Sequence, residues 1–189
     1  MKGKLVIFSA PSGSGKTTIV RKLLEKDLNL EFSISACSRP KRTSEVNGKD
    51  YYFFSIDEFK HKIDQGEFVE WEEVYHDHFY GTLKSEIERI RNQGKNVIFD
   101  VDVKGGVNLK QAYKDEALAL FVMPPSVEEL ERRLVNRSSE EPEKIKVRIA
   151  KAEAEIKYAN QFDKVIYNDN LEKAVKEAEK AIQKFISLN

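Results

Sequence analysis

The chain is short of the residues that mark several common classes of protein. Its 189 residues include one cysteine, Cys37, and one tryptophan, Trp71. A single cysteine cannot form an intrachain disulfide, so the sequence gives no sign of an oxidising compartment. Basic and acidic residues number 32 each, which gives a formal net charge of zero and no global field to attract nucleic acid.

Long apolar runs are lacking too. The longest, Ala117–Met123, is far below the roughly 20 residues of a membrane-spanning helix. The first residues lead directly into the apolar run Leu5–Phe8, so we expect no signal peptide. We therefore expect a cytoplasmic protein with no membrane or nucleic-acid partner, and the length predicts one compact domain.

Apolar runs alternate with helical patterns along most of the chain. Such alternation is typical of a parallel sheet covered by helices on both faces, an α/β fold. The expected strands are Leu5–Phe8, Phe32–Ala36, Asn96–Val101, Leu118–Met123 and Lys164–Tyr167. The expected helices are Thr17–Glu25, Leu83–Gln93, Lys104–Tyr113, Ser126–Asn136 and Leu171–Ser187.

Two stretches break this alternation. The first, about 38–80, is rich in aromatic and turn residues, and we expect it to contain a strand at Tyr51–Phe54 and a helix at Ile56–Gln65. The second, about 136–159, has a polar break before a highly charged helix, Glu143–Ala159. We interpret the first as a small inserted lobe and the second as a helical lid, with a plain surface hairpin as the alternative.

A glycine-rich loop with a lysine and a threonine lies between the first strand and the first helix. Its glycines allow successive N–H groups to point at one anion, and the helix N-terminus adds partial positive charge. Lys16 can reach the β- and γ-phosphates of a nucleoside triphosphate, and the Thr17 hydroxyl can bind Mg²⁺. Ala10 stands where the usual pattern starts with glycine. The expected ATP contacts are Ala10, Pro11, Ser12, Gly13, Ser14, Gly15, Lys16, Thr17 and Thr18.

Further short motifs follow in order along nearly the whole chain. They are Ser35–Arg42, Glu45–Tyr51, Gly66–Trp71, Tyr80–Thr82, Asp100–Asp102, Pro125–Leu134 and Lys164–Asp169. With the loop Ser9–Thr17, this set resembles the guanylate kinases, which transfer a phosphoryl group from ATP to GMP. The resemblance implies a single domain with a P-loop core at about 1–34, 84–125 and 160–189. It also implies a GMP-binding lobe at about 35–83 and a lid at about 126–159.

The resemblance implies an acceptor site in the inserted lobe. Guanidinium forks and hydroxyl groups suit the dianionic phosphate of GMP. The residues implied for this phosphate are Arg39, Arg42, Tyr51 and Tyr80.

The resemblance implies that Glu70 recognises the base, with Ser35 and Thr82 beside it. A carboxylate can accept hydrogen bonds from guanine N1–H and the N2 amine, whereas adenine has an acceptor at N1. A site that pairs buried polar groups can reject the wrong base by about 10⁴-fold. The alternative for Glu70 is a surface acid among its acidic neighbours.

Asp100 and Asp102 stand at alternate positions at the end of an apolar strand, where open parallel sheets bind ligands. The resemblance implies that Asp100 holds Mg²⁺ through water and that Asp102 orients the acceptor-site arginines or the nucleotide. An ordinary helix N-cap is the alternative for an aspartate in such a place.

In the lid, Arg133 and Arg137 share one helix face, and Arg148 lies on the following helix. The resemblance implies that these arginines, with Lys16, stabilise the charge on the transferred phosphoryl group. Solvated surface residues are the alternative for each arginine taken singly.

Two rival functions follow from the same fold. One is a peptide-binding module without catalysis, but such modules typically lack the intact P-loop and lid arginines. The other is a kinase for another acceptor, such as AMP or dTMP, against which Glu70 and Ser35 argue. We expect GMP and dGMP as acceptors, a role in purine nucleotide metabolism, and a solvated loop at His76–His78. The sequence leaves a homo-oligomer open.

Overall fold

The computed structural model describes residues 2–137 and 142–188. Its core is a parallel sheet of five strands in the order β2-β7-β1-β8-β9. Leu5 pairs with Val97 on one side of β1 and with Ala117 on the other. The strands are β1 (Leu5–Ser9), β2 (Leu30–Phe32), β7 (Asn96–Val101), β8 (Ala117–Met123) and β9 (Lys164–Tyr167).

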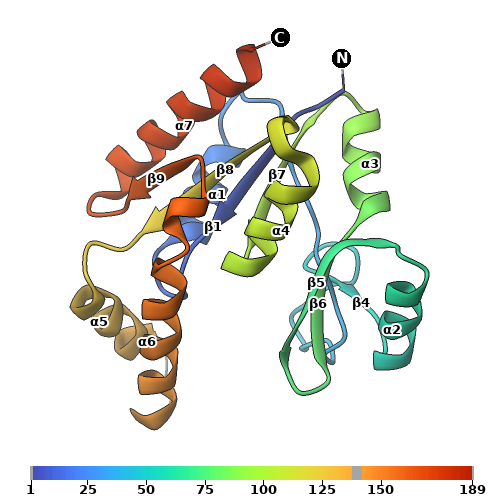
Figure 1. Ribbon diagram of the computed structural model, residues 1–189, viewed down its shortest axis with the longest axis horizontal. Coiled ribbons are helices and arrows are strands. Elements are labelled where there is room, and N and C mark those ends of the chain that lie inside the picture. Colours follow the sequence, from blue (N-terminus) through green and yellow to red (C-terminus); the bar gives the residue numbers. More distant parts are fainter. Residues whose placement is uncertain (1, 138–141, 189) are drawn as a thin grey trace.

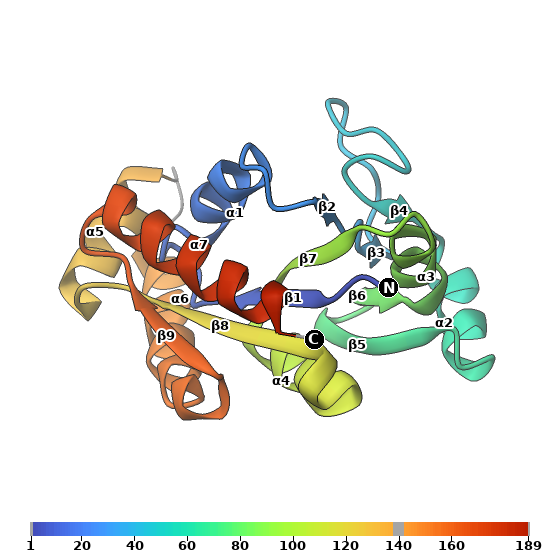
Figure 2. The same ribbon diagram turned by 90° about the horizontal axis from the view of Figure 1, so that it is seen from above.

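Helices bury both faces of this sheet, as the alternation of strands and helices predicted. Val6 and Phe8 point to the face covered by α1 (Lys16–Leu24) and α7 (Leu171–Ser187). The intervening Leu5 and Ile7 point to the opposite face, because successive side chains on a strand alternate. That face is covered by α3 (Lys84–Asn92) and α4 (Val103–Tyr113). Figure 2 shows α1 and α4 on opposite sides of β1.

The inserted lobe has a sheet and an apolar core of its own. Its four strands, in the order β4-β3-β6-β5, lie beside helix α2 (Ile56–Asp64). The rings of Phe59 and Phe68 stack with their centroids 4.4 Å apart, and Phe79 packs against Phe59. The strands are β3 (Ala36–Cys37), β4 (Tyr52–Phe53), β5 (Phe68–Tyr75) and β6 (His78–Leu83).

The single strand expected at Phe32–Ala36 is wrong. β2 ends at Phe32 in the core sheet, and β3 begins at Ala36 in the lobe sheet. Between them, the Ile34 N–H donates to the Glu86 carboxylate at 3.1 Å, outside any strand ladder. Apolar residues at alternate positions look like one strand in the sequence, because the pattern does not tell which sheet each half joins.

The segment that we expect to be the lid contains two helices, α5 (Val127–Arg137) and α6 (Pro142–Ile156). They pack on each other through Leu130, Leu134, Ile145 and Ala152. α6 ends at Ile156, three residues before the expected end, and a short 3₁₀ turn follows at Ala159–Gln161. Figure 1 shows α5 and α6 at one side of the molecule and the inserted lobe at the other. Among the described residues, the helices are too short or too polar to cross a bilayer.

Candidate active site

A cleft of about 1070 Å³ lies at the carboxyl ends of β1 and β7. Sites for a single small ligand usually occupy about 300–1,000 Å³, so the volume of this cleft lies just above that range. Four parts of the chain line it: Ala10–Thr18 with Arg21, the inserted lobe, the end of β7 and helix α6. The lobe contributes Ser35, Tyr51, Glu70 and Tyr80, and the end of β7 contributes Asp100 and Asp102.

The glycine-rich loop has the backbone that a phosphate cradle needs. Gly13 and Gly15 adopt φ values of 91° and 90°, which side chains rarely tolerate. A Cβ atom at Gly15 would lie 2.3 Å from Nδ2 of Asn168, so the position is also sterically closed. Gly15 precedes α1 and has no side chain to cap it, which leaves this helix N-terminus suited to an anion.

Asp100 holds the two side chains that the sequence assigned to the phosphates and the metal. Its Oδ1 lies 2.6 Å from Nζ of Lys16, and its Oδ2 accepts a hydrogen bond of 2.7 Å from the Thr17 hydroxyl. Lys16 Nζ also donates to the carbonyl oxygen of Val101. Carboxylate and hydroxyl oxygens are ligands that suit Mg²⁺, directly or through water, so Thr17 and Asp100 fit the expected metal.

Glu70 is a buried carboxylate with one hydroxyl partner. Glu70 is 8% exposed, and the Thr82 hydroxyl donates a hydrogen bond of 2.6 Å to Oε1 of Glu70. Burial raises the pKa of Glu70 to about 7, and the negative charge of Asp102 adds to the rise against the lowering effect of Thr82. A Cβ atom at Gly105 would lie 2.8 Å from Oε2 of Glu70, so the first turn of α4 contacts this carboxylate.

Asp102 takes the role of a helix N-cap. Its Oδ1 accepts a 2.7 Å hydrogen bond from the Gly105 N–H and so begins α4. This is the alternative that the sequence left open, and the residue also lines the cleft.

Arg39 is held in place by a carboxylate that the sequence reasoning did not assign. Its two terminal nitrogens donate to Glu45 at 2.7 and 2.5 Å, a bidentate pair. Glu45 also accepts the backbone N–H of Arg42, and these bonds lower the pKa of Glu45 to about 2. The Arg39 guanidinium lies 5.1 Å from the ring centroid of Tyr51, whose ring meets that of Tyr80 edge-on. The signal for Glu45 was its place at the start of the motif Glu45–Tyr51.

The lid arginines differ in where they lie. Arg148 Nη2 donates to the hydroxyl of Ser12 in the glycine-rich loop at 2.5 Å. Arg133 is directed to Glu129, at 2.9 Å, and to the backbone oxygen of Asn168, at 3.5 Å. The side chain of Arg137 lies outside the described part of the structure. Four described site candidates lie outside the lining of the cleft: Arg39, Arg42, Thr82 and Arg133.

Asn168 is a second residue that the sequence reasoning left without a role. It is 6% exposed, and its Nδ2 donates to the carbonyl oxygen of Ser14 at 2.7 Å. The end of β9 is thereby tied to the glycine-rich loop. Its signal was the motif Lys164–Asp169 at the end of an apolar strand.

The loop with two histidines lies apart from the cleft lining. Glu73, His76 and Asp77 offer ligand atoms within 4.8 Å of one another, but the His76 side chain is 94% exposed. Exposed acidic groups of this kind are common at surfaces without any ion, so a solvated loop stays our interpretation.

Comparisons with known proteins agree with the geometry. The family model described as guanylate kinase matches residues 2–185. The guanylate kinase of Bacteroides thetaiotaomicron is 54% identical over 187 residues, which cover 99% of this chain and 92% of that protein. The guanylate kinase of Porphyromonas gingivalis is 55% identical over 185 residues, which cover 97% and 98%.

A solved structure gives the same result at lower sequence identity. The guanylate kinase from Anaplasma phagocytophilum matches with a TM-score of 0.79 and 28% identity, covering 98% of this chain and 87% of that one. The P-loop core, the inserted lobe and the lid therefore have a common explanation: the chain belongs to the guanylate kinase family.

Proposed function

We propose that the cleft transfers the γ-phosphoryl group of ATP to GMP, giving ADP and GDP, and that dGMP is also an acceptor. The observation that carries this is the shared lining of one cleft by Lys16 of the glycine-rich loop and by the buried carboxylate of Glu70. A triphosphate site and a site for a base with two adjacent donors thus face the same space. We divide the domain into a core at about 1–34, 84–125 and 160–189, a GMP-binding lobe at about 35–83 and a lid at about 126–159, of which the lobe and the lid close over the nucleotides.

The donor half is built around Asp100. We assign the triphosphate to Ala10–Thr18, with the Lys16 ammonium passing from Asp100 to the β- and γ-phosphate oxygens when ATP enters. Thr17 and Asp100 would hold Mg²⁺, the latter through water. When bound, this ion offsets negative charge on the β- and γ-phosphates.

The acceptor half is built around Glu70. The ionised carboxylate accepts hydrogen bonds from guanine N1–H and the N2 amine. The Thr82 hydroxyl donates to Oε1 of the same carboxylate and so fixes its orientation. Ser35 and Asp102 line the cleft near it and contact the base or orient the nucleotide. The phosphate of GMP is assigned to Arg39, Arg42, Tyr51 and Tyr80.

Glu45 prepares the phosphate end of the acceptor half. Its bidentate pair with Arg39 fixes the plane of the guanidinium before the ligand arrives. A preorganised fork loses less side-chain entropy on binding a phosphate than a mobile one. Glu45 is thus a positioning residue for Arg39.

The transfer needs no nucleophilic side chain. A phosphate oxygen of GMP attacks the γ-phosphorus, and the bond to the β–γ bridging oxygen breaks, so that ADP leaves. Lys16 and the lid residues Arg133, Arg137 and Arg148 stabilise the charge spread over the equatorial oxygens. Closure of lid and lobe excludes water, which would otherwise hydrolyse ATP.

A direct assay tests this function. The purified chain is mixed with Mg-ATP and, in turn, GMP, dGMP, AMP, UMP and IMP, and ADP release is measured. Turnover is expected with GMP and dGMP and depends on added Mg²⁺. Faster turnover with AMP than with GMP would contradict the proposal.

These substrates place the protein in purine nucleotide metabolism, and we infer that it works in the cytoplasm. The single cysteine, Cys37, is fully buried in the lobe sheet and needs no oxidising environment. ATP and GMP are the partners that the proposal requires, without nucleic acid or membrane. It leaves the oligomeric state open.

A further inference from the structure

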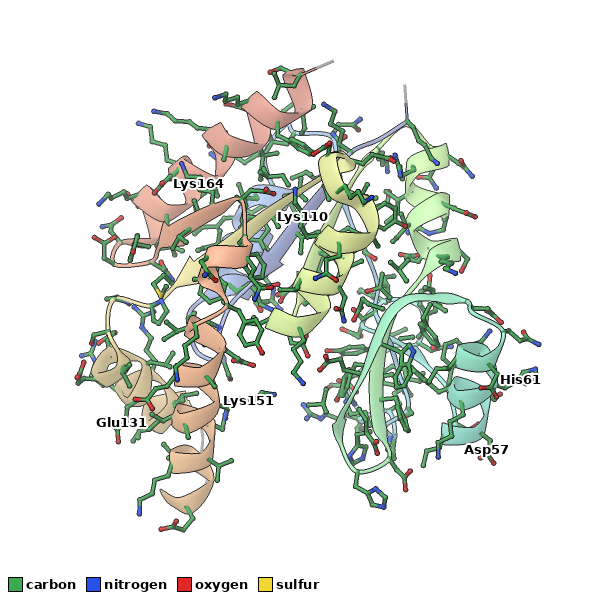
Figure 3. All side chains as sticks on the ribbon, in the orientation of Figure 1. Asp57, His61, Lys110, Glu131, Lys151 and Lys164 are labelled. Carbon is green, nitrogen blue, oxygen red and sulfur yellow. The ribbon has the colours of Figure 1, made fainter. Side chains whose placement is uncertain are left out.

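The cleft has charged walls beyond the residues assigned to the two nucleotides. Glu72 of β5 lines it from the lobe, and Lys151 and Glu155 of α6 line it from the lid. Glu72 follows Glu70 by two positions and so shares its face of the strand, opposite Tyr80 on β6. Figure 3 labels Lys151 on the side of α6 that is turned toward β5 and β6. Two side chains of opposite charge thus lie on facing walls.

Lys151 lies on the face of α6 that lines the cleft. Arg148, Lys151 and Glu155 are three and four residues apart, so they share one stripe of α6, and all three line the cleft. At one end of this stripe Arg148 already reaches the Ser12 hydroxyl. Lys151 Nζ lies 3.8 Å from Oε1 of Glu155, too far for a hydrogen bond, and its side chain is 56% exposed.

Glu72 has a cation nearby that it does not contact closely. Its side chain is 22% exposed, and its Oε2 lies 3.8 Å from Nζ of Lys104, a lysine with 67% of its side chain exposed. Burial and the negative charge of Asp102 raise the pKa of Glu72, while Lys104 and Lys151 oppose the rise. A half-buried carboxylate beside another negative charge is stabilised by a closer cation.

We propose that Glu72 and Lys151 are positioning residues that form an ion pair across the cleft when the lid and the lobe close over the substrates. The pair links the lobe to the helix turn next to Arg148 and so holds that arginine toward the transferred phosphoryl group. The inference rests on the proposed function, because closure over two nucleotides brings the walls together. It assigns to Glu72 a role in closure that differs from the base recognition by Glu70.

The main alternative is that Glu72 forms an ion pair with Lys104 alone. In that case the pair is local to β5 and α4, and the lid takes no part. The two cases are separated by comparing Lys151→Gln with Lys104→Gln. Loss of a partly exposed ion pair is expected to lower kcat with GMP about five-fold in Lys151→Gln, with little change in Lys104→Gln.

A double-mutant cycle tests the pair itself. kcat and KM for GMP are measured at saturating Mg-ATP for Glu72→Gln, Lys151→Gln, the double variant and the wild type. We expect each single change to lower kcat about five-fold and the double change to lower it no further. Independent effects that multiply in the double variant would overturn the proposal.

A second test of the ion pair exchanges the charges of Glu72 and Lys151. Glu72→Lys and Lys151→Glu should each lower kcat, and the variant with both changes should recover most of it. A purely structural role for Glu72 would lower the thermal midpoint, and the exchange would not restore kcat. If the exchanged variants fold poorly, the double-mutant cycle with Glu72→Gln and Lys151→Gln still tests the ion pair.

Failure of this inference can be told from failure of the proposed function. A wild-type chain without GMP turnover would overturn both. An active wild type without coupling between Glu72 and Lys151 would overturn the ion pair alone.

Discussion

Nζ of Lys16 lies 2.6 Å from Oδ1 of Asp100, so the lysine of the glycine-rich loop and the carboxylate at the end of β7 form a direct ion pair. Both side chains are mostly buried, with 14% and 13% exposed. The pair keeps a lysine extended in the place where the triphosphate is expected. It also keeps the charge of Asp100 compensated before any metal binds.

Replacement of this lysine should remove catalysis without unfolding the chain. Lys16→Ala is expected to lower kcat by about 10²–10³-fold, the effect of deleting one preorganised cation from a charged transition state. The assay is ADP release with GMP, alongside the thermal midpoint. Lys22→Ala, an exposed lysine of the same helix, is the matched control and should retain full turnover. Near-normal turnover of Lys16→Ala would exclude the assigned role.

Glu70→Gln should weaken guanine recognition. A carboxamide offers one acceptor and one donor, so the donor opposes one of the two guanine donors. We expect kcat/KM for GMP to fall on the order of 10²-fold, and the preference for GMP over AMP to shrink. Glu73→Gln, on an exposed residue of the same strand, should change neither. Unchanged selectivity in Glu70→Gln would contradict base recognition by this residue.

The pH dependence of the acceptor should report Glu70. Its pKa is raised to about 7 by burial, so the carboxyl is increasingly protonated as the pH falls below 7 and then cannot accept from guanine N1–H. kcat/KM for GMP should therefore fall with decreasing pH, by up to about ten-fold per pH unit. The phosphate of GMP itself titrates near pH 6.

Glu70→Gln separates these two titrations. In this variant the limb near pH 7 should vanish, and the one from the substrate phosphate should remain. Identical profiles for wild type and variant would assign the whole limb to the substrate.

Glu45→Gln should act on the acceptor phosphate through Arg39. The variant loses one of the two charge-assisted bonds that fix the guanidinium. We expect KM for GMP to rise about ten-fold, with KM for ATP unchanged. Asp57→Asn, on an exposed residue of α2 in the same lobe, serves as the control. Equal rises in both KM values would indicate a general loss of structure instead.

Asn168→Asp should act on the donor side. The carboxylate keeps the size of the amide but cannot donate to the Ser14 carbonyl oxygen, and the two oxygens repel. KM for ATP is expected to rise about ten-fold while KM for GMP stays the same. Asp169→Asn changes the next, exposed residue and should leave both constants unaltered. A selective effect on GMP would place Asn168 outside the triphosphate half.

The sequence by itself determined those elements of the fold that depend on residues close together in the chain. Strand β1, the glycine-rich loop and helix α1 follow one another within about twenty residues, and their apolar pattern and glycines suffice to predict them. The alternation of buried strands with helices likewise predicted the covered parallel sheet, which the structure confirms. The aromatic composition of the segment at about 38–80 predicted a small inserted lobe, and the structure gives this segment an apolar core of its own around Phe59.

Only the tertiary structure decided the features that depend on contacts between distant residues. It separated Phe32 and Ala36 into two sheets, because strand register is set by the partners Ile98 and Gly81 and not by local pattern. It also made Asp102 an N-cap beside the buried Glu70. Hydrogen bonds and charges at the site act over a few ångströms in space, and the folded chain alone sets those distances.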